Sequence, residues 1–251
     1  MTASYPARKG TISPSFERLV VNAFGAKNTE LVVLGSEPVT PHYHRVHVDC
    51  GDFLRTHGVH PSMWLRLWFD DDGKDHQRAF TLVDADEASG RATLEFALHD
   101  GVAARWSQNV TAGTRIRASL LGSKCPWPSE KPAPGTSWER TVLIGGTACV
   151  PAIRSLLDHW SEAPATVLLH SEYDDDRDIP LGLAAATDVE WFAMGDEALL
   201  TRTHDFAGEA TTRFWVTTEA SATRAVVRAL RKDHGVGKER LHAQAYWSAA
   251  G

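Results

Sequence analysis

Residues 141–153 read TVLIGGTACVPAI: a short apolar strand, a pair of glycines and a helical pattern that starts near a proline. Two adjacent glycines let the backbone approach a phosphate group closely, and Pro151 presets the first turn of the following helix. This strand–glycine–helix order is what a dinucleotide pyrophosphate requires, although the GxGxxG spacing of the standard fingerprint is absent. We therefore predict that Gly145, Gly146 and Thr147 lie at a dinucleotide-binding turn.

Strands continue to alternate with helices after this turn. Helical patterns are expected at Pro151–Trp160 and at Ala220–His234, where the apolar residues recur at helical spacing. Further strands are expected at Thr166–His170, Val189–Ala193 and Phe214–Thr217. This alternation predicts an α/β domain with a parallel sheet.

The first half of the sequence has a different pattern, in which short strands follow one another with turn residues between them. About six strands at this spacing predict a closed antiparallel β-barrel. They are expected at Glu30–Gly35, His42–Cys50, Trp64–Phe69, Ala79–Val83, Ala92–Leu98 and Arg115–Leu120. Residues 126–135 (PWPSEKPAPG) hold four prolines and no periodicity. We therefore assign residues 1–128 to the barrel domain, 129–137 to a Pro-rich linker and 138–251 to the α/β domain.

Composition excludes several classes of protein. The 251 residues carry a formal net charge of -6, which does not indicate a nucleic-acid-binding surface. The three cysteines (Cys50, Cys125 and Cys149) lie far apart, which argues against an iron–sulfur cluster, a zinc ribbon or a disulfide framework. No apolar run approaches a membrane span, and residues 1–9 lack the apolar core of a signal peptide. We expect a cytoplasmic protein, a monomer, with no metal site at His42, His44 and His47.

The barrel half contains the strand segment Arg78-Ala79-Phe80-Thr81-Leu82. An arginine and a hydroxyl three residues apart can bind the diphosphate or ribityl chain and the edge of a flavin, while the aromatic residue between them lies flat on the isoalloxazine ring. The alternative is an ordinary barrel strand with alternating faces.

A second segment, residues 95–106 (EFALHDGVAARW), is a strand that ends near Gly101 and opens into a helix through small residues. Backbone amides at a helix start bind anions, so this segment is a candidate pyrophosphate site. His99 lies at the strand end, where it would cap the isoalloxazine ring or the ribityl tail. The alternative is a plain strand–turn–helix with a capping histidine.

In this order and spacing, these segments resemble the siderophore-interacting protein family, a branch of the ferredoxin–NADP reductase-like flavoproteins. The family motif R-x-Y-[ST], which grips FAD, corresponds to residues 78–81, and DFVxHGxGPASxWA corresponds to residues 95–107. PGDxLxIxGP corresponds to residues 112–123, GDETALPAI to 145–153, WVAGE to 215–219 and GYWRxG to 245–251. The resemblance runs from about Phe16 to the last residue.

The chain departs from the family motifs at several positions. The family's GPAS segment is replaced by Val102-Ala103-Ala104-Arg105. The stacking tyrosine is replaced by Phe80 and a family acid by Gly146. A glycine is replaced by Thr218, and an arginine is replaced by Ser248. Either Arg105 compensates for the changed phosphate-binding turn by pairing with a phosphate oxygen, or FAD binds weakly.

The resemblance implies an FAD-containing oxidoreductase that takes hydride from NADH or NADPH and passes electrons singly to a ferric siderophore, releasing Fe(II). No catalytic side chain is expected, because the flavin supplies the chemistry. The cofactor-binding residues would be Arg78, Phe80, Thr81, Leu82, Leu98, His99, Gly101, Ala103, Ala104, Arg105, Trp106, Gly145, Gly146, Thr147, Glu219, Tyr246 and Trp247. An anionic siderophore would prefer a basic mouth, for which the candidates are Lys124, Arg228, Arg231, Lys232, Lys238 and Arg240.

Two other functions stay open, because a fold alone does not fix function. One is a flavin reductase of a biosynthetic pathway with another acceptor. The other is a binding protein that retains FAD without nicotinamide turnover, which the changes at Val102, Gly146, Thr218 and Ser248 would allow. Between the two nicotinamides, NADH is slightly favoured. Residues 171–178 (SEYDDDRD) place five acids around one arginine, in the loop where the 2′-phosphate of NADPH needs cations.

Overall fold

The computed structural model describes residues 25–124, 138–159, 164–183, 187–193, 195 and 197–248. The predicted linker, residues 129–137, lies outside the described residues, as does Cys125. In the part that is described, no helix is both long enough and apolar enough to cross a membrane.

The first half is a closed antiparallel barrel, as predicted. Its strands are β1 (Lys27–Thr40), β2 (Tyr43–Asp49), β3 (Trp64–Asp71), β4 (Lys74–Asp86), β5 (Arg91–Ala97) and β6 (Arg115–Leu120). They close in the order β1-β2-β5-β4-β3-β6. Inward-facing side chains on alternate positions of β3 illustrate how the strands enclose a core. Leu65, Leu67 and Phe69 are almost fully buried and pack into the barrel core. Two short helices, α2 (Phe53–His57) and α3 (Val102–Asn109), accompany the barrel.

The second half is built on a parallel sheet, which is also as predicted. Its strands are β7 (Arg140–Gly146), β8 (Ala165–Ser171), β9 (Thr187–Ala193), β10 (Thr212–Val216) and β11 (Leu241–Ala243), in the order β11-β10-β7-β8-β9. Strands β8 and β9 therefore lie on one side of β7, and β10 and β11 lie on the other. The carboxyl ends of β7 and β10 form the switch point at which open α/β sheets bind ligands.

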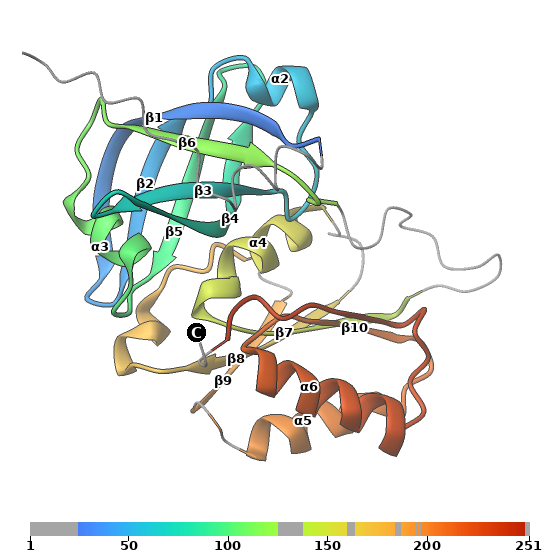
Figure 1. The fold of residues 1–251 in the computed structure, drawn as a ribbon. Coiled ribbons are helices and arrows are strands. Elements are labelled where there is room, and N and C mark those ends of the chain that lie inside the picture. The colour runs from blue at the N-terminus through green and yellow to red at the C-terminus, as the bar shows by residue number, and fades with distance from the viewer. Residues whose placement is uncertain are drawn as a thin grey trace, which may run out of the picture.

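Helices cover both faces of this sheet (Figure 1). The connection from β7 consists of the 3₁₀ turn η1 (Thr147–Cys149) and helix α4 (Val150–His159), which lies between the sheet and the barrel. Helices α5 (Glu197–Ala207) and α6 (Ala220–Arg228) lie on the opposite face, and η2 (Asp174–Asp178) follows β8. Two apolar clusters match these layers. Tyr43 of the barrel packs with α4 on one face, and Val226 of α6 packs on the other.

The sequence located most elements and missed a few. The predicted helix Pro151–Trp160 is α4, and the predicted helix Ala220–His234 is α6 followed by a π-helical turn, η3 (Ala229–Asp233). The short helix α2, the helix α5 and the strand β11 were not predicted. β11 has three residues and is held by pairing with β10, so no local pattern marks it.

Candidate functional site

The barrel has an open edge where the Arg78–Thr81 segment lies. Strand β4 pairs with β3 from Lys74 to Thr81, but its pairing with β5 starts only at Leu82, opposite Leu94. Within residues 25–124, no ladder pair joins Arg78–Thr81 to β5. Because backbone N–H and C=O groups need partners, this edge is suited to bind the polar rim of a ring system.

An aromatic platform lies at this open edge. The half-buried Phe80 ring packs against Phe96 with ring centroids 4.4 Å apart, and Trp106 of α3 completes the cluster at 5.9 Å from Phe96. One side of Phe80 is thus fixed by the barrel core, which leaves the other for a ligand. Leu82 is buried in the core and Leu98 packs against the core. Their backbone N–H groups donate to the carbonyls of Met63 and His42, so neither of these two predicted residues has a free N–H for a ligand.

Helix α3 begins beside the platform. Its N-cap residue, Gly101, supplies no side-chain cap, and Ala103 and Ala104 are buried and small. No side chain of the described residues caps the N–H groups of its first turn, so the helix start stays the predicted anion site. A side chain at Gly101 would place its Cβ 2.7 Å from Cε1 of His99, so the histidine ring covers this glycine.

The two predicted phosphate-binding arginines differ. The guanidinium of the exposed Arg78 donates to the backbone oxygen of its neighbour Gln77 at 2.8 Å, so it can turn to a ligand. Arg105 instead pairs with Asp71 at 3.1 Å and Asp100 at 3.2 Å. These exposed pairs are weak, yet they place carboxylates beside the group that was expected to bind phosphate.

Thr81 connects the barrel to the C-terminal segment. Its buried side chain contacts the Tyr246 phenol, and burial raises the pKa of Tyr246. Tyr246 lies against Trp215, with ring centroids 6.1 Å apart, and beside Cys149. Burial also raises the pKa of the Cys149 thiol to about 11, so this cysteine is not a reactive thiolate. The predicted flavin strand thus contacts the α/β domain at its carboxyl edge.

The glycine pair lies at the switch point, as the strand–glycine–helix pattern predicted. A Cβ at Gly145 would lie 2.9 Å from Cβ of Cys149, and a Cβ at Gly146 would lie 2.8 Å from Cε1 of His170. A side chain at either position would therefore force these neighbours to shift. Thr147 begins η1, directly before α4. Sequence reasoning missed His170, which is the last residue of a predicted strand and belongs to no motif.

Glu219 and Trp247 have structural contacts that the motifs did not reveal. The Glu219 carboxylate caps α6 by accepting from the backbone N–H groups of Ser221 and Ala222. The Trp247 carbonyl accepts from the N–H of Ala220 at 2.9 Å, and its side chain is 37% exposed. Glu219 thus already occupies the helix start that a phosphate would otherwise use.

The basic side chains predicted to form one mouth are not gathered at the interface between barrel and sheet. Arg228, Arg231 and Lys232 line a groove of about 490 Å³ along α6, together with Arg224. This helix covers the face of the sheet opposite the barrel (Figure 1). Of the remaining candidates, Lys124 follows β6 of the barrel, and Lys238 and Arg240 lie between η3 and β11. These six residues were grouped by their charge alone. The fold places Lys124 in the barrel domain and the other five in the α/β domain.

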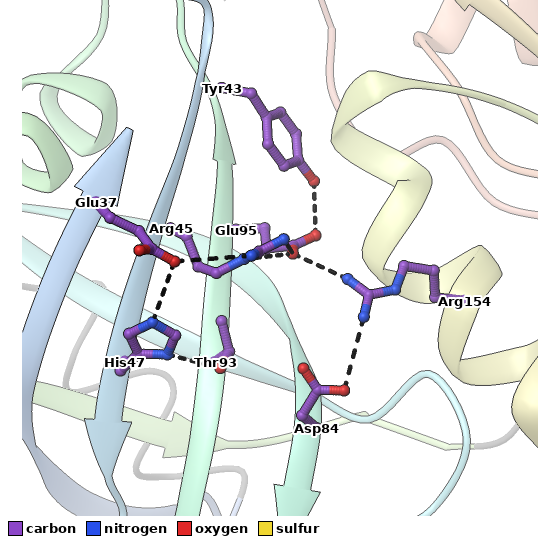
Figure 2. A network of polar contacts seen from close by, with 8 residues as sticks. All are labelled: Glu37, Tyr43, Arg45, His47, Asp84, Thr93, Glu95 and Arg154. Carbon is purple, nitrogen blue, oxygen red and sulfur yellow. Dashed lines mark hydrogen bonds and ion pairs between the residues drawn. The ribbon is translucent and has the colours of Figure 1, made fainter. Parts of the chain in front are cut away.

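A buried ionic network joins the barrel to α4 (Figure 2). The Glu95 side chain is 1% exposed and accepts from Arg45 at 2.8 Å, from Arg154 of α4 at 3.0 Å and from the Tyr43 hydroxyl at 2.9 Å. Arg154 also lies 3.7 Å from Asp84 on β4. Since α4 follows the glycine pair directly, this network fixes the pair relative to β4 and β5. No sequence pattern indicates this network, because its members are distant along the chain.

A second contact joins the barrel to the acidic loop after β8. Asp175 accepts from the backbone N–H of His42 at 2.9 Å and lies 2.7 Å from its ring nitrogen, and the His42 and Tyr173 rings stack at 3.6 Å. Asp176 is buried and accepts from the N–H groups of Glu172 and Tyr173. Two of the five acids of this loop are therefore engaged within the protein.

The Asp175 contact predicts a pH effect on stability. Burial alone would raise the pKa of Asp175, but the contacts of its carboxylate with Thr40 and His42 outweigh burial and lower the pKa to about 2. Because an unfolded aspartate titrates near pH 3.9, the contact stabilises the fold above about pH 4 and is lost as the pH falls toward 2. We expect Asp175→Asn to lower the urea midpoint at pH 7 and to lower it less at pH 3. An equal difference at both pH values would contradict this.

The described residues contain no group of three or more His, Cys, Asp or Glu side chains arranged to hold a metal. His44 is buried, which lowers its pKa, and the His47 ring contacts the Thr93 hydroxyl at 3.1 Å.

Comparison with known proteins agrees with this geometry. Residues 7–120 match the model of the siderophore-interacting FAD-binding domain, and residues 138–250 match that of the siderophore-interacting protein. A curated relative, the mycobactin import ATP-binding/permease protein IrtA of Mycobacterium tuberculosis, is 31% identical over 239 residues. These cover 92% of this chain and 27% of the relative, so the chain spans about a quarter of that protein's length.

Two solved structures share the fold. The siderophore-interacting protein SipS of Aeromonas hydrophila has a TM-score of 0.72 at 20% identity, over 90% of this chain and 93% of that one. A ferredoxin NADP+ reductase of Neisseria gonorrhoeae with bound FAD and NADP has a TM-score of 0.66 at 14% identity, over 88% of this chain and 97% of that one. At these identities the likeness shows the fold.

Proposed function

The chain belongs to the siderophore-interacting protein family, and from this premise we propose that it is an FAD-dependent, NADH- or NADPH-consuming reductase of ferric siderophores. When bound, FAD accepts the two electrons of a hydride and passes them on singly. Iron(III) held by hard oxygen ligands binds less tightly once it is reduced, so the metal is released as Fe(II).

The observation that carries the proposal is the contact between Thr81 and Tyr246. It brings the open edge of β4 next to the carboxyl edge of the parallel sheet, where the glycine pair lies. A flavin ring at β4 and a nicotinamide at the switch point would then face each other. Hydride transfer requires this proximity and orientation.

Each part of the site has a role in this proposal. Phe80 holds one face of the flavin ring, and the Arg78 guanidinium pairs with a phosphate. The uncapped first turn of α3 receives the FAD pyrophosphate, and the turn at Gly145-Gly146-Thr147 receives that of the nicotinamide nucleotide. Tyr246, which contacts Thr81 and lies beside Cys149, excludes water from the space between the flavin and the nicotinamide.

The acceptor is proposed from the family and its relatives. IrtA proteins are named for mycobactin import, so we assign a ferric siderophore that has reached the cytoplasm as the acceptor. One NADH should yield two Fe(II), since each iron takes one electron. The test combines FAD-loaded protein, NADH and ferric mycobactin without oxygen, with a chromogenic Fe(II) chelator. Reduced flavin without any Fe(II) would show that the acceptor is a different molecule.

The acidic loop predicts a preference for NADH. Glu172, Asp174 and Asp178 are exposed there beside a single arginine, so a 2′-phosphate would meet net repulsion. Three arginines could reverse this balance: Arg202, Arg213 and Arg224. Arg202 is held by Glu190 at 2.8 Å and Asp205 at 3.1 Å. Arg213 is buried and donates to the Thr141 hydroxyl at 2.8 Å, and Arg224 lines the groove along α6. Stopped-flow flavin reduction should be faster with NADH. A preference for NADPH that weakens as salt is added would contradict the prediction and point to a basic cluster at the site.

A further inference from the structure

His170 occupies the switch point beside the proposed nicotinamide site. The residue lies near the end of β8 and is 3% exposed. Its ring lies over Gly146, where a Cβ would come within 2.8 Å of Cε1 and 2.9 Å of Nε2. The Nε2 atom of His170 is also hydrogen-bonded to the hydroxyl of Thr218. The imidazole thus fills the space between the ends of β7 and β10.

The other ring nitrogen has no partner. Nδ1 of His170 is buried and makes no hydrogen bond within the described part of the chain. Buried polar atoms are almost always paired, and leaving one unpaired is costly. A ligand that bonds to Nδ1 would recover this cost. The carboxyl edge at which the atom lies is where open α/β sheets bind their ligands.

Two departures from the family motifs meet at this ring. Gly146 stands where GDETALPAI has an aspartate, and Thr218 stands where WVAGE has its glycine. A carboxylate side chain at position 146 would overlap the His170 ring, and a glycine at position 218 would leave Nε2 without its hydroxyl partner. Gly146 and Thr218 therefore both accommodate the His170 ring, so the two departures from the family motifs belong to one arrangement.

We propose that His170, seated between Gly146 and Thr218, is the hydrogen-bond partner that this chain offers to the nicotinamide nucleotide in place of the family acid. The inference rests on the nucleotide site of the proposed function. Burial lowers the pKa of His170 against the opposing effect of Asp176, so the ring is neutral at neutral pH. In the tautomer in which Nε2 accepts from the Thr218 hydroxyl, Nδ1 carries the ring hydrogen and donates it to a nucleotide oxygen. A neutral donor also replaces a negative charge beside an anionic pyrophosphate.

Two amide variants test the contact. Asparagine places its nitrogen near Nδ1 of a histidine, whereas glutamine places its nitrogen near Nε2. In FAD-loaded protein, His170→Asn should bind NAD+ about as well as the wild type. His170→Gln should bind it about tenfold more weakly, the size expected for one lost hydrogen bond. Both variants should bind FAD like the wild type, because His170 lies in the α/β domain and not at the predicted flavin site.

The outcomes separate this inference from the function on which it rests. Wild-type affinity in His170→Gln, or equal weakening in both variants, would overturn the role of Nδ1 and leave the proposed function standing. A wild-type protein that binds neither NAD+ nor NADP+ would overturn both.

A third measurement tests the fit among these positions. Gly146→Asp should lower the thermal unfolding midpoint in the wild-type background, because its Cβ meets the imidazole. In a His170→Val background the same substitution should lower the midpoint far less. Equal losses in the two backgrounds would show that positions 146 and 170 are not coupled, which would overturn the inference.

Discussion

Replacing Glu95 by leucine is expected to lower the free energy of unfolding by about 3–5 kcal/mol, the usual cost of removing one partner from a buried ionic network. The substitution leaves Arg45 and Arg154 without their shared carboxylate, and their side chains are only 22% and 15% exposed. It also removes the acceptor of the buried Tyr43 hydroxyl. Urea unfolding monitored by circular dichroism measures the loss.

Glu37 provides the matched control for Glu95. Its carboxylate lies on the same network, 3.7 Å from Arg45, but its side chain is 55% exposed. Glu37→Gln should therefore cost less than about 1 kcal/mol, as exposed ion pairs do. Adding Arg154→Leu to Glu95→Leu should recover part of the loss, because one uncompensated charge disappears. If the Glu95 variant is as stable as the Glu37 variant, the network does not hold α4 against the barrel.

Replacing Arg78 by alanine is expected to weaken FAD binding about a hundredfold, so that the protein purifies largely without yellow colour. A charge-assisted hydrogen bond contributes about 1.5–3 kcal/mol, so losing one or two gives a change of this size. The fold should be unaffected, because the exposed guanidinium bonds only to the adjacent Gln77 carbonyl among the hydrogen bonds that the structure shows. Flavin absorbance per mole of protein and fluorescence titration with FAD measure the effect.

Arg91→Ala is the control for Arg78. This arginine is also exposed on a barrel strand, but it lies where β5 is fully paired, away from the open edge. It should bind FAD like the wild type. Equal flavin content in the two variants would remove Arg78 from the cofactor site.

The sequence predicted the architecture well because its signals are local. Alternating strands gave the barrel, and the strand–glycine–helix turn gave the position of β7 and α4. Residues 78–81 were recognised as a motif, yet the reason for their suitability is that β4 leaves β5 at Leu82, which no strand pattern reveals.

The rest of the site depends on contacts between distant segments. Glu95 and Arg154 are 59 positions apart, and His170 and Thr218 are 48 apart. No spacing rule connects such pairs. The basic residues were grouped by charge alone, and charge says nothing about which face of the sheet a helix covers.

The most direct test of the account is a visible absorption spectrum of the FAD-loaded protein, taken without oxygen before and after adding NADH. The account predicts flavin peaks that bleach, because it places the flavin at the open edge of β4, facing a nicotinamide at the carboxyl end of β7. Peaks that persist with both NADH and NADPH would contradict hydride transfer and favour a protein that retains FAD without turnover. A protein that takes up no FAD would contradict the site itself.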